Sequence, residues 1–211
     1  HVNLSLQRAI DRYLGSFLCR VFSLLPNRNS VSLLKTDNIL IILLSEMGSL
    51  VLAYPMMDYL RKRYPGAQLN AVVFEKNREV LDLFNIVEKK NILVIRDSSA
   101  KTFFNDLIGV VRKIRGTNID IVIDCELFAR VSSLLAFLSG APIKVGFYPF
   151  KQEGLYRGNF INRRVLYNPY LHISRQFLNL AYALEDHTIP GSKHVIPTEP
   201  LVVPQVNFPI E

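Results

Sequence analysis

The segment from Ile39 to Ala53 constrains the fold of this chain more than any other. It opens with six consecutive apolar residues, Ile39 to Leu44, a run typical of a strand that is buried on both faces of a sheet. A short turn containing Gly48 follows, and a helical pattern then continues to Tyr64. This order is the start of a parallel α/β unit, in which ligands bind just beyond the carboxyl ends of the strands. Ser45 to Ser49 is therefore the first candidate site. The turn lacks G-x-G-x-x-G and G-x-x-x-x-G-K-[ST], so ordinary dinucleotide and P-loop interpretations are weak.

Strand and helix patterns alternate after residue 38. This order predicts an α/β fold with a doubly wound, Rossmann-like parallel sheet and right-handed crossovers. Residues 149–170 interrupt the alternation and are interpreted as a long loop. The expected strands are 38–44, 68–75, 91–96, 119–125 and 143–148, and the expected helices are 50–64, 77–84, 100–115, 127–139 and 171–185.

Both ends of the chain differ from this central region. Residues 4–25 carry apolar side chains at helical spacing with arginines between them, which predicts a basic amphipathic helix. Two interpretations stay open: the helix lies on an anionic membrane surface, or it packs on the domain or a partner. Residues after 187 are rich in proline and are typical of a linker. The expected units are an amphipathic helix at 1–30, a Rossmann-like domain at 31–187 and a linker at 188–211 that leads toward a second domain.

Composition limits the classes of partner. The formal charge is +7, with 25 Lys and Arg against 18 Asp and Glu, which suits an acidic partner such as a phosphorylated sugar, a nucleotide or an anionic lipid. Nucleic acid is disfavoured because aromatic residues do not alternate with basic ones along an exposed strand.

Cys19 and Cys125 lie within apolar segments and are expected to be buried thiols. No spacing of His, Cys and Asp predicts a metal site, and no apolar run reaches the roughly 18 residues of a membrane span.

Four pieces of the sequence resemble the heptosyltransferase-like glycosyltransferases of glycosyltransferase family 9. The segment from Leu44 to Pro55, with Leu60 to Pro65, is similar to the family's first strand, turn and helix. Three later pieces agree in type and order, over a resemblance that spans roughly residues 38 to 185. They are Asp120 to Asp124 with Ser139-Gly140-Ala141, Ile143 to Phe147, and Tyr170 to Leu178, the last of which is similar to the family's His-containing helix. His172, which begins this helix, is expected to make a structural hydrogen bond.

The resemblance implies a GT-B arrangement, in which two Rossmann-like domains face each other across a cleft. The first domain mainly holds the acceptor, a lipopolysaccharide core or a related glycan. The second holds most of the nucleotide-sugar donor, expected here to be ADP-linked, and no other cofactor is implied. This chain then corresponds to the acceptor half, which alone should not turn over efficiently. The expected location is cytoplasmic, and under the membrane interpretation of residues 4–25 the chain would also contact the inner face of the bacterial inner membrane as a peripheral protein.

The candidate catalytic residues are Glu46 and Ser49. The family's turn usually reads Met-Gly-Asp, and the resemblance implies that its aspartate is the base for the acceptor hydroxyl; here Ser49 stands at that position. A serine of ordinary pKa cannot accept this proton without a base of its own. Glu46 is the alternative carboxylate. The competing interpretation, which we favour at this point, is that Glu46 caps the helix or pairs with an arginine.

The candidate substrate-binding residues come from three segments. Asp124 and Glu126 end the fourth strand, where they would bind a sugar hydroxyl, accept a proton, pair with Arg130 or cap the next helix. The basic residues near the long loop suit a phosphate or carboxylate on the acceptor, although an ordinary solvated basic face is nearly as good an explanation. The full set is Ser45, Met47, Gly48, Asp124, Glu126, Arg130, Lys151, Arg157, Arg163 and Arg164.

Two functions fit these residues. The first is the acceptor domain of an inverting glycosyltransferase. The second is a non-catalytic module that has lost the usual aspartate and holds an anionic glycolipid at the membrane surface.

Overall fold

A computed structural model describes residues 11–25, 35–127, 129–148 and 156–185. Its centre is a six-stranded sheet in the order β3-β2-β1-β4-β5-β6, and every neighbouring pair of strands is parallel. This confirms the predicted Rossmann-like α/β fold. The strands are β1 (Asn38–Ile42), β2 (Gln68–Phe74), β3 (Ile92–Ile95), β4 (Ile121–Asp124), β5 (Ile143–Tyr148) and β6 (Arg163–Leu166).

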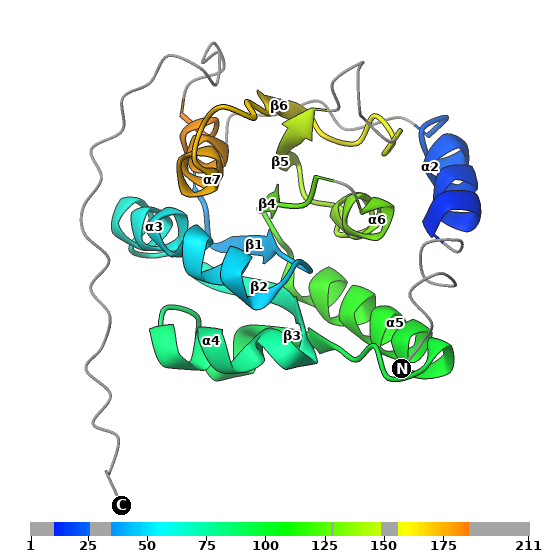
Figure 1. The fold of residues 1–211 in the computed structure, drawn as a ribbon, viewed down its shortest axis with the longest axis horizontal. Helices are drawn as coiled ribbons and strands as arrows, with labels where there is room; N and C mark the ends of the chain where they lie inside the picture. Colours follow the sequence, from blue (N-terminus) through cyan, green and yellow to red (C-terminus); the bar gives the residue numbers. More distant parts are fainter. Residues whose placement is uncertain (1–10, 26–34, 128, 149–155, 186–211) are drawn as a thin grey trace, which may run out of the picture.

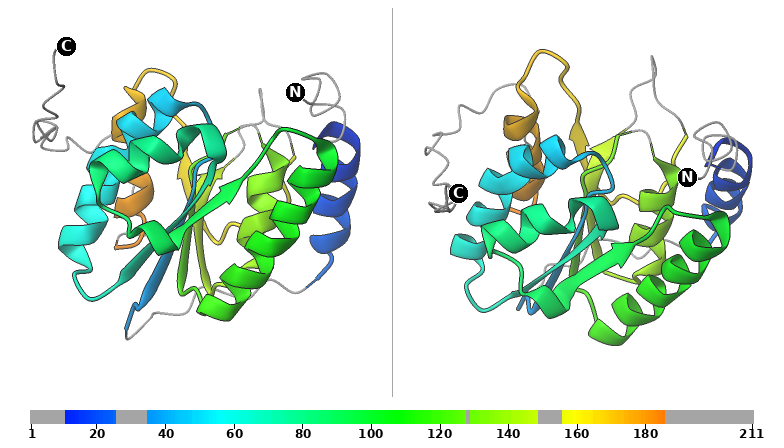
Figure 2. Two further views of the ribbon diagram at one scale, coloured as in Figure 1. Left: turned by 90° about the horizontal axis from the view of Figure 1, so that it is seen from below. Right: turned by 60° about the horizontal axis from the view of Figure 1, so that its bottom comes forward.

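Helices cover both faces of the sheet (Figure 1). One face carries α3 (Met47–Arg63), α4 (Arg78–Phe84) and α7 (Ile173–Tyr182), and the other carries α5 (Ala100–Thr117) and α6 (Arg130–Leu138). The short 3₁₀ turns η2 (Glu75–Asn77) and η3 (Lys89–Asn91) lead into α4 and β3. Because α3, α4, α5 and α6 each follow a parallel strand, all begin at the carboxyl edge of the sheet, as two further views show (Figure 2).

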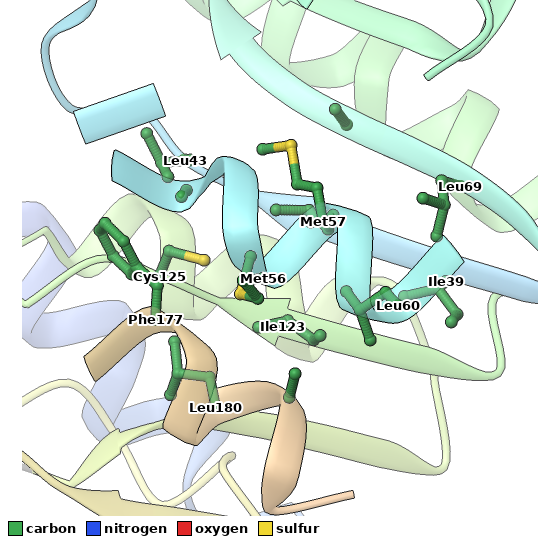
Figure 3. Close-up of a cluster of buried hydrophobic side chains, with 14 of the residues drawn as sticks. Ile39, Leu43, Met56, Met57, Leu60, Leu69, Ile123, Cys125, Phe177 and Leu180 are labelled. Carbon is green, nitrogen blue, oxygen red and sulfur yellow. The ribbon is translucent and has the colours of Figure 1, made fainter. Parts of the chain in front are cut away.

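The hydrophobic core has two layers because successive residues of a strand point to opposite faces. Ile39, Ile41 and Leu43 point toward α3 and α7, whereas Leu40 and Ile42 point toward α5 and α6. Figure 3 shows the first layer, where Met56, Met57 and Leu60 of α3 lie over the sheet beside Phe177 and Leu180 of α7. The uninterrupted apolar run in β1 therefore serves both layers, as a central parallel strand requires.

The sixth strand corrects the sequence analysis, which interpreted all of 149–170 as a loop. Residues Arg163–Leu166 pair in parallel with β5. The strand was missed because Arg163 and Arg164 break its apolar pattern and because it is an edge strand with alternate residues buried. Arg163 is buried nonetheless, since its guanidinium donates to the carbonyls of Ala183 and Leu184 just beyond α7.

The described part of the N-terminal segment consists of η1 (Asp11–Gly15), one turn of π-helix, and α2 (Ser16–Phe22). It packs outside α6, where the ring of Phe22 stacks on Phe137 at 5.3 Å between centroids. Phe137 in turn contacts Phe160 at 4.6 Å. Packing on the domain is therefore confirmed for one face of this helix.

The predicted domain boundaries stay predictions. Residues 1–10, 26–34 and the linker expected at 188–211 lie outside the described residues. In the described part of the chain, no helix combines the length and the hydropathy needed to cross a bilayer.

Candidate functional site at the carboxyl edge of the sheet

The turn between β1 and α3 is held in place from both neighbouring strands. The Glu126 carboxylate, just after β4, accepts from the backbone N–H of Leu44 at 2.7 Å and from the Ser45 hydroxyl at 2.8 and 2.9 Å. On the other side, the Asn77 amide, just after β2, donates to the Ser45 carbonyl oxygen. Ser45 is thus a structural residue in which the hydroxyl and the carbonyl are both engaged inside the protein.

Burial controls the protonation of Glu126. Removal from water raises the pKa of its carboxyl, and the hydrogen bonds from Ser45 and from the backbone oppose this effect. Sequence reasoning placed Glu126 among the substrate-binding residues. The structure places it beneath the turn, where it fixes the backbone from which Glu46 and Ser49 project.

The next residues along the turn face solvent. Glu46, Met47 and Gly48 are exposed, and Ser49 is half-buried. Glu46 occupies the N-cap position of α3 without a side-chain capping bond, and it makes no side-chain hydrogen bond or ion pair with any residue that the structure describes. Glu46 therefore stands at the capping position that was predicted, but its side chain does not cap the helix. The result is an accessible carboxylate at the start of a helix.

The start of α3 also offers donors. The first backbone N–H groups of a helix have no partner within the helix, and they attract anionic or polar oxygens. The Ser49 backbone N–H donates to the Glu46 carbonyl oxygen at 2.9 Å. The backbone N–H groups of Met47 and Gly48 then lie at the open end of the helix. A Cβ at Gly48 would meet no atom within 4 Å, so this glycine leaves room for a ligand at the edge.

Asp124 is paired with Arg157, not with Arg130. The Arg157 Nη2 lies 2.5 Å from Asp124 Oδ2 and also donates to the Ser132 hydroxyl at 2.8 Å. Its Nε donates to the Ala129 carbonyl at 2.9 Å, and its Nη1 donates to the carbonyl of Glu126. Four of the five guanidinium N–H groups are then committed inside the protein. Arg157 ties the segment after β5 to the end of β4 and the start of α6.

Arg130 ties the N-terminal helix to the same region. Its Nη1 lies 3.2 Å from Asp11 Oδ2, its backbone N–H donates to Asp11 Oδ1 at 2.9 Å, and its Nε donates to the Tyr156 carbonyl at 2.9 Å. Gly15 passes so close that an added Cβ would lie 3.1 Å from the Arg130 Cβ.

The remaining predicted basic residues do not gather on one surface. Arg163 points toward the end of α7 and Arg164 toward the opposite side, where its Nε donates to the Ile161 carbonyl at 3.3 Å and its side chain lines a small hollow with Arg157 and Gly158. Burial lowers the pKa of Arg163. Lys151 lies outside the described residues. The structure thus places Glu46, Met47 and Gly48, with the half-buried Ser49, at an open edge, and it leaves Arg164 exposed elsewhere. The other described members of the predicted set are internal tethers: Ser45, Asp124, Glu126, Arg130, Arg157 and Arg163.

His172 and Asn77 also lie at this edge of the sheet. His172, the N-cap of α7, makes the structural hydrogen bond that was expected, since its Nδ1 accepts from the Ser174 backbone N–H at 3.3 Å. Asn77 was missed by sequence reasoning, although an amide directly after the second strand was a usable signal.

Among the described residues, no three His, Cys, Asp or Glu side chains lie close enough together to hold a metal ion.

The fold defines the class of domain: a Rossmann-like α/β unit, consistent with one half of a GT-B fold. Solved structures with this fold include a glycosyltransferase family 9 protein from Veillonella parvula, with 24% identity over 74% of this chain and 43% of that chain, at a TM-score of 0.61. A second is heptosyltransferase WaaC from E. coli, solved with ADP-2-deoxy-2-fluoro heptose. It shares 21% identity over 69% of this chain and 47% of the WaaC chain, at a TM-score of 0.57.

The E. coli ADP-heptose lipopolysaccharide heptosyltransferase II shares 18% identity over 81% of this chain and 46% of its own, at a TM-score of 0.59. The chain therefore has a heptosyltransferase-like fold and spans less than half the length of each of these structures. No protein-family profile and no curated protein sequence matches it.

Proposed function

We propose that this chain is the acceptor-side domain of a heptosyltransferase-like glycosyltransferase. The observation that carries the proposal is the open turn Glu46–Ser49 at the carboxyl edge of a sheet with the heptosyltransferase fold. This is the edge at which open α/β sheets bind ligands. The proposed acceptor is a lipopolysaccharide core or a related glycan, and the proposed donor is an ADP-linked sugar held mainly by a second domain. The proposed place of action is the cytoplasmic face of the bacterial inner membrane.

The proposed chemistry is a single inverting displacement. An acceptor hydroxyl oxygen attacks the anomeric carbon of the nucleotide sugar, the bond from that carbon to the diphosphate oxygen breaks, and the nucleoside diphosphate leaves. The hydroxyl proton passes to the Glu46 carboxylate, which is exposed and unpaired among the described residues. The Met47 and Gly48 N–H groups would bind acceptor oxygens at the start of α3. Glu126 and Asn77 keep the turn rigid by holding Ser45.

One observation favours a second candidate function. Ser49 stands where the resemblance implies an aspartate, and no described residue hydrogen-bonds to its side chain in a way that would activate it. If Glu46 does not take the proton, the domain binds an anionic glycolipid without transferring a sugar to it.

The test uses a form of the protein that includes a donor domain. It is incubated with ADP-heptose and a lipid-linked core acceptor, and two products are measured: released ADP, and acceptor that is heavier by one heptose. Transfer requires both products in equal amounts. Acceptor binding without either product identifies the binding module. Acceptor binding is monitored by the NMR shifts of the backbone amides in the isotope-labelled chain. If the acceptor does not bind at the Glu46–Ser49 turn, both functions are contradicted.

A further inference from the structure

The helix formed by η1 and α2 is apolar on two sides. Its inner side consists of Gly15, Cys19 and Phe22, which pack against α6 and leave Cys19 without exposed surface. Its outer side carries a second apolar stripe. The stripe consists of Tyr13, Leu14, Phe17, Val21, Leu24 and Leu25, and the exposed fractions reach 72% at Tyr13, 62% at Phe17 and 86% at Leu24.

This outer stripe is basic at its margins. Arg12 and Arg20 are exposed within the same helical segment, and Arg12 lies over the ring of Tyr13 at 6.0 Å. The only acidic residue of 11–25 is Asp11, and its carboxylate is engaged by Arg130 on the inner side. The outer surface of this helix therefore combines aromatic and aliphatic side chains with positive charge alone.

We infer that this outer stripe docks on an anionic membrane surface. A helix with an apolar face, aromatic residues and flanking arginines, yet too polar to cross the bilayer, is suited to the plane of the headgroups. Phe17, Leu24 and Tyr13 enter the boundary of the acyl chains, and Arg12 and Arg20 bind lipid phosphates. The inference adds a docking surface to the proposed place of action, and it holds whether or not the domain takes part in sugar transfer.

The contacts with the domain make this surface rigid. Asp11–Arg130, Phe22–Phe137 and the hydrogen bond from the Tyr156 hydroxyl to the Ser23 hydroxyl, at 2.8 Å, fix the helix from end to end. The outer stripe therefore binds without detaching the helix, and Cys19 stays covered.

Charge argues against a second copy of the chain as the occupant. A two-fold interface places the same patch on both sides, so the Arg12 and Arg20 pairs of two copies would approach each other with no acidic residue between them. Like charges that face each other across an interface are unfavourable. An anionic lipid surface supplies the opposite charge to both arginines.

The test is flotation of the full chain with vesicles of phosphatidylcholine alone and with vesicles that contain 30% phosphatidylglycerol. The expected result is binding to the anionic vesicles only. The variant R12Q/R20Q is expected to bind about 20- to 30-fold more weakly, since each basic residue near an anionic surface contributes about fivefold. The variant F17S/L24S is expected to abolish binding, and both variants are expected to melt within about 3 °C of the parent because the altered side chains are exposed.

Matched controls separate this site from general charge and general hydrophobicity. K89Q/K101Q removes two exposed lysines elsewhere, and L83S removes an exposed leucine of α4; both are expected to bind like the parent. Equal binding by F17S/L24S and L83S would overturn the inference, as would a dimer in solution that F17S/L24S converts to monomer. Labelling of Cys19 on vesicles but not in solution would contradict the rigid docking described here.

Discussion

Arg157 and Asp124 form an ion pair in the interior of the protein, with Arg157 Nη2 2.5 Å from Asp124 Oδ2 and both side chains almost without exposed surface. The pair joins the segment after β5 to the carboxyl end of β4, directly below the edge at which the site is proposed. Burial raises the pKa of Asp124, and the Arg157 charge opposes that effect.

Removal of Arg157 should therefore be costly. R157A leaves the buried Asp124 carboxylate without its partner, and the expected loss in the free energy of unfolding is about 3–5 kcal/mol, measured by urea denaturation. R112A, which removes an exposed arginine of α5, should change it by less than about 0.5 kcal/mol. The double variant D124N/R157A should lose less than the sum of the two single variants. A loss below about 1 kcal/mol in R157A would show that the pair does not organise this region.

Glu126 should make stability depend on pH in a particular direction. Because burial raises its pKa in the folded state, the folded protein binds this proton more tightly than the unfolded chain does. The associated stability is present below the ordinary pKa of a glutamate and is lost as the pH rises through the higher folded value. E126Q can keep the bonds to Leu44 and Ser45 through its amide, but it cannot titrate.

The measurement is urea denaturation of the parent and E126Q from about pH 4 to pH 7.5. The free energy of unfolding of the parent, relative to that of E126Q, should fall across this interval. Asp124 is present in both proteins, so its titration contributes to both curves. Parallel curves would mean that Glu126 has the same pKa in the folded and unfolded chain.

Gly158 should tolerate no side chain. Its φ of +84° lies in the left-handed region, and an added Cβ would overlap the Phe160 ring. G158A is expected to destabilise the fold by about 2–3 kcal/mol, because Phe160 carries the packing of Phe137 and hence of α2. G109A is the matched control, since a Cβ there meets nothing within 4 Å and α5 should gain up to about 1 kcal/mol. A G158A protein as stable as the parent would refute the close approach.

The two thiols should resist modification in the folded protein. Burial raises the pKa of Cys19 to about 11, and burial also raises that of Cys125. At pH 8, a pKa two units above the ordinary 9.0 lowers the thiolate fraction about 100-fold, and coverage slows the reaction further. Reaction with a thiol-specific disulfide reagent should therefore be at least about 100-fold slower than in urea. Fast labelling of Cys19 without denaturant would mean that α2 leaves α6 readily.

The fold could be predicted from the sequence to the extent that its strands were apolar. The run Ile39 to Leu44 and the alternation that follows predicted five parallel strands, and all five are present. The sixth was not predictable in the same way. Arg163 is buried in it only because the last carbonyls near α7 accept its hydrogen bonds, and that contact depends on residues 20 positions away.

The place of the turn in the fold was predictable, but its contacts were not. Parallel topology alone places Ser45 to Ser49 at the carboxyl edge of the sheet, where open α/β sheets bind ligands. Sequence could not show that Ser45 is bound by Glu126 and Asn77 while Glu46 stays exposed, because these contacts join three different strands. The resemblance stated for residues 38 to 185 agrees with the heptosyltransferase-like fold of the solved structures.

The most direct test of the central claim is the rate of E46Q in a form of the protein that includes a donor domain, compared with E88Q. Glu88 is an exposed glutamate before β3, at the opposite edge of the sheet, and its ion pair with Lys90 is a surface pair of little energetic value. The account predicts that E46Q lowers kcat for ADP release about 100-fold or more, with acceptor binding retained, while E88Q matches the parent. A decrease below about threefold in E46Q would contradict the assignment of Glu46 as the base.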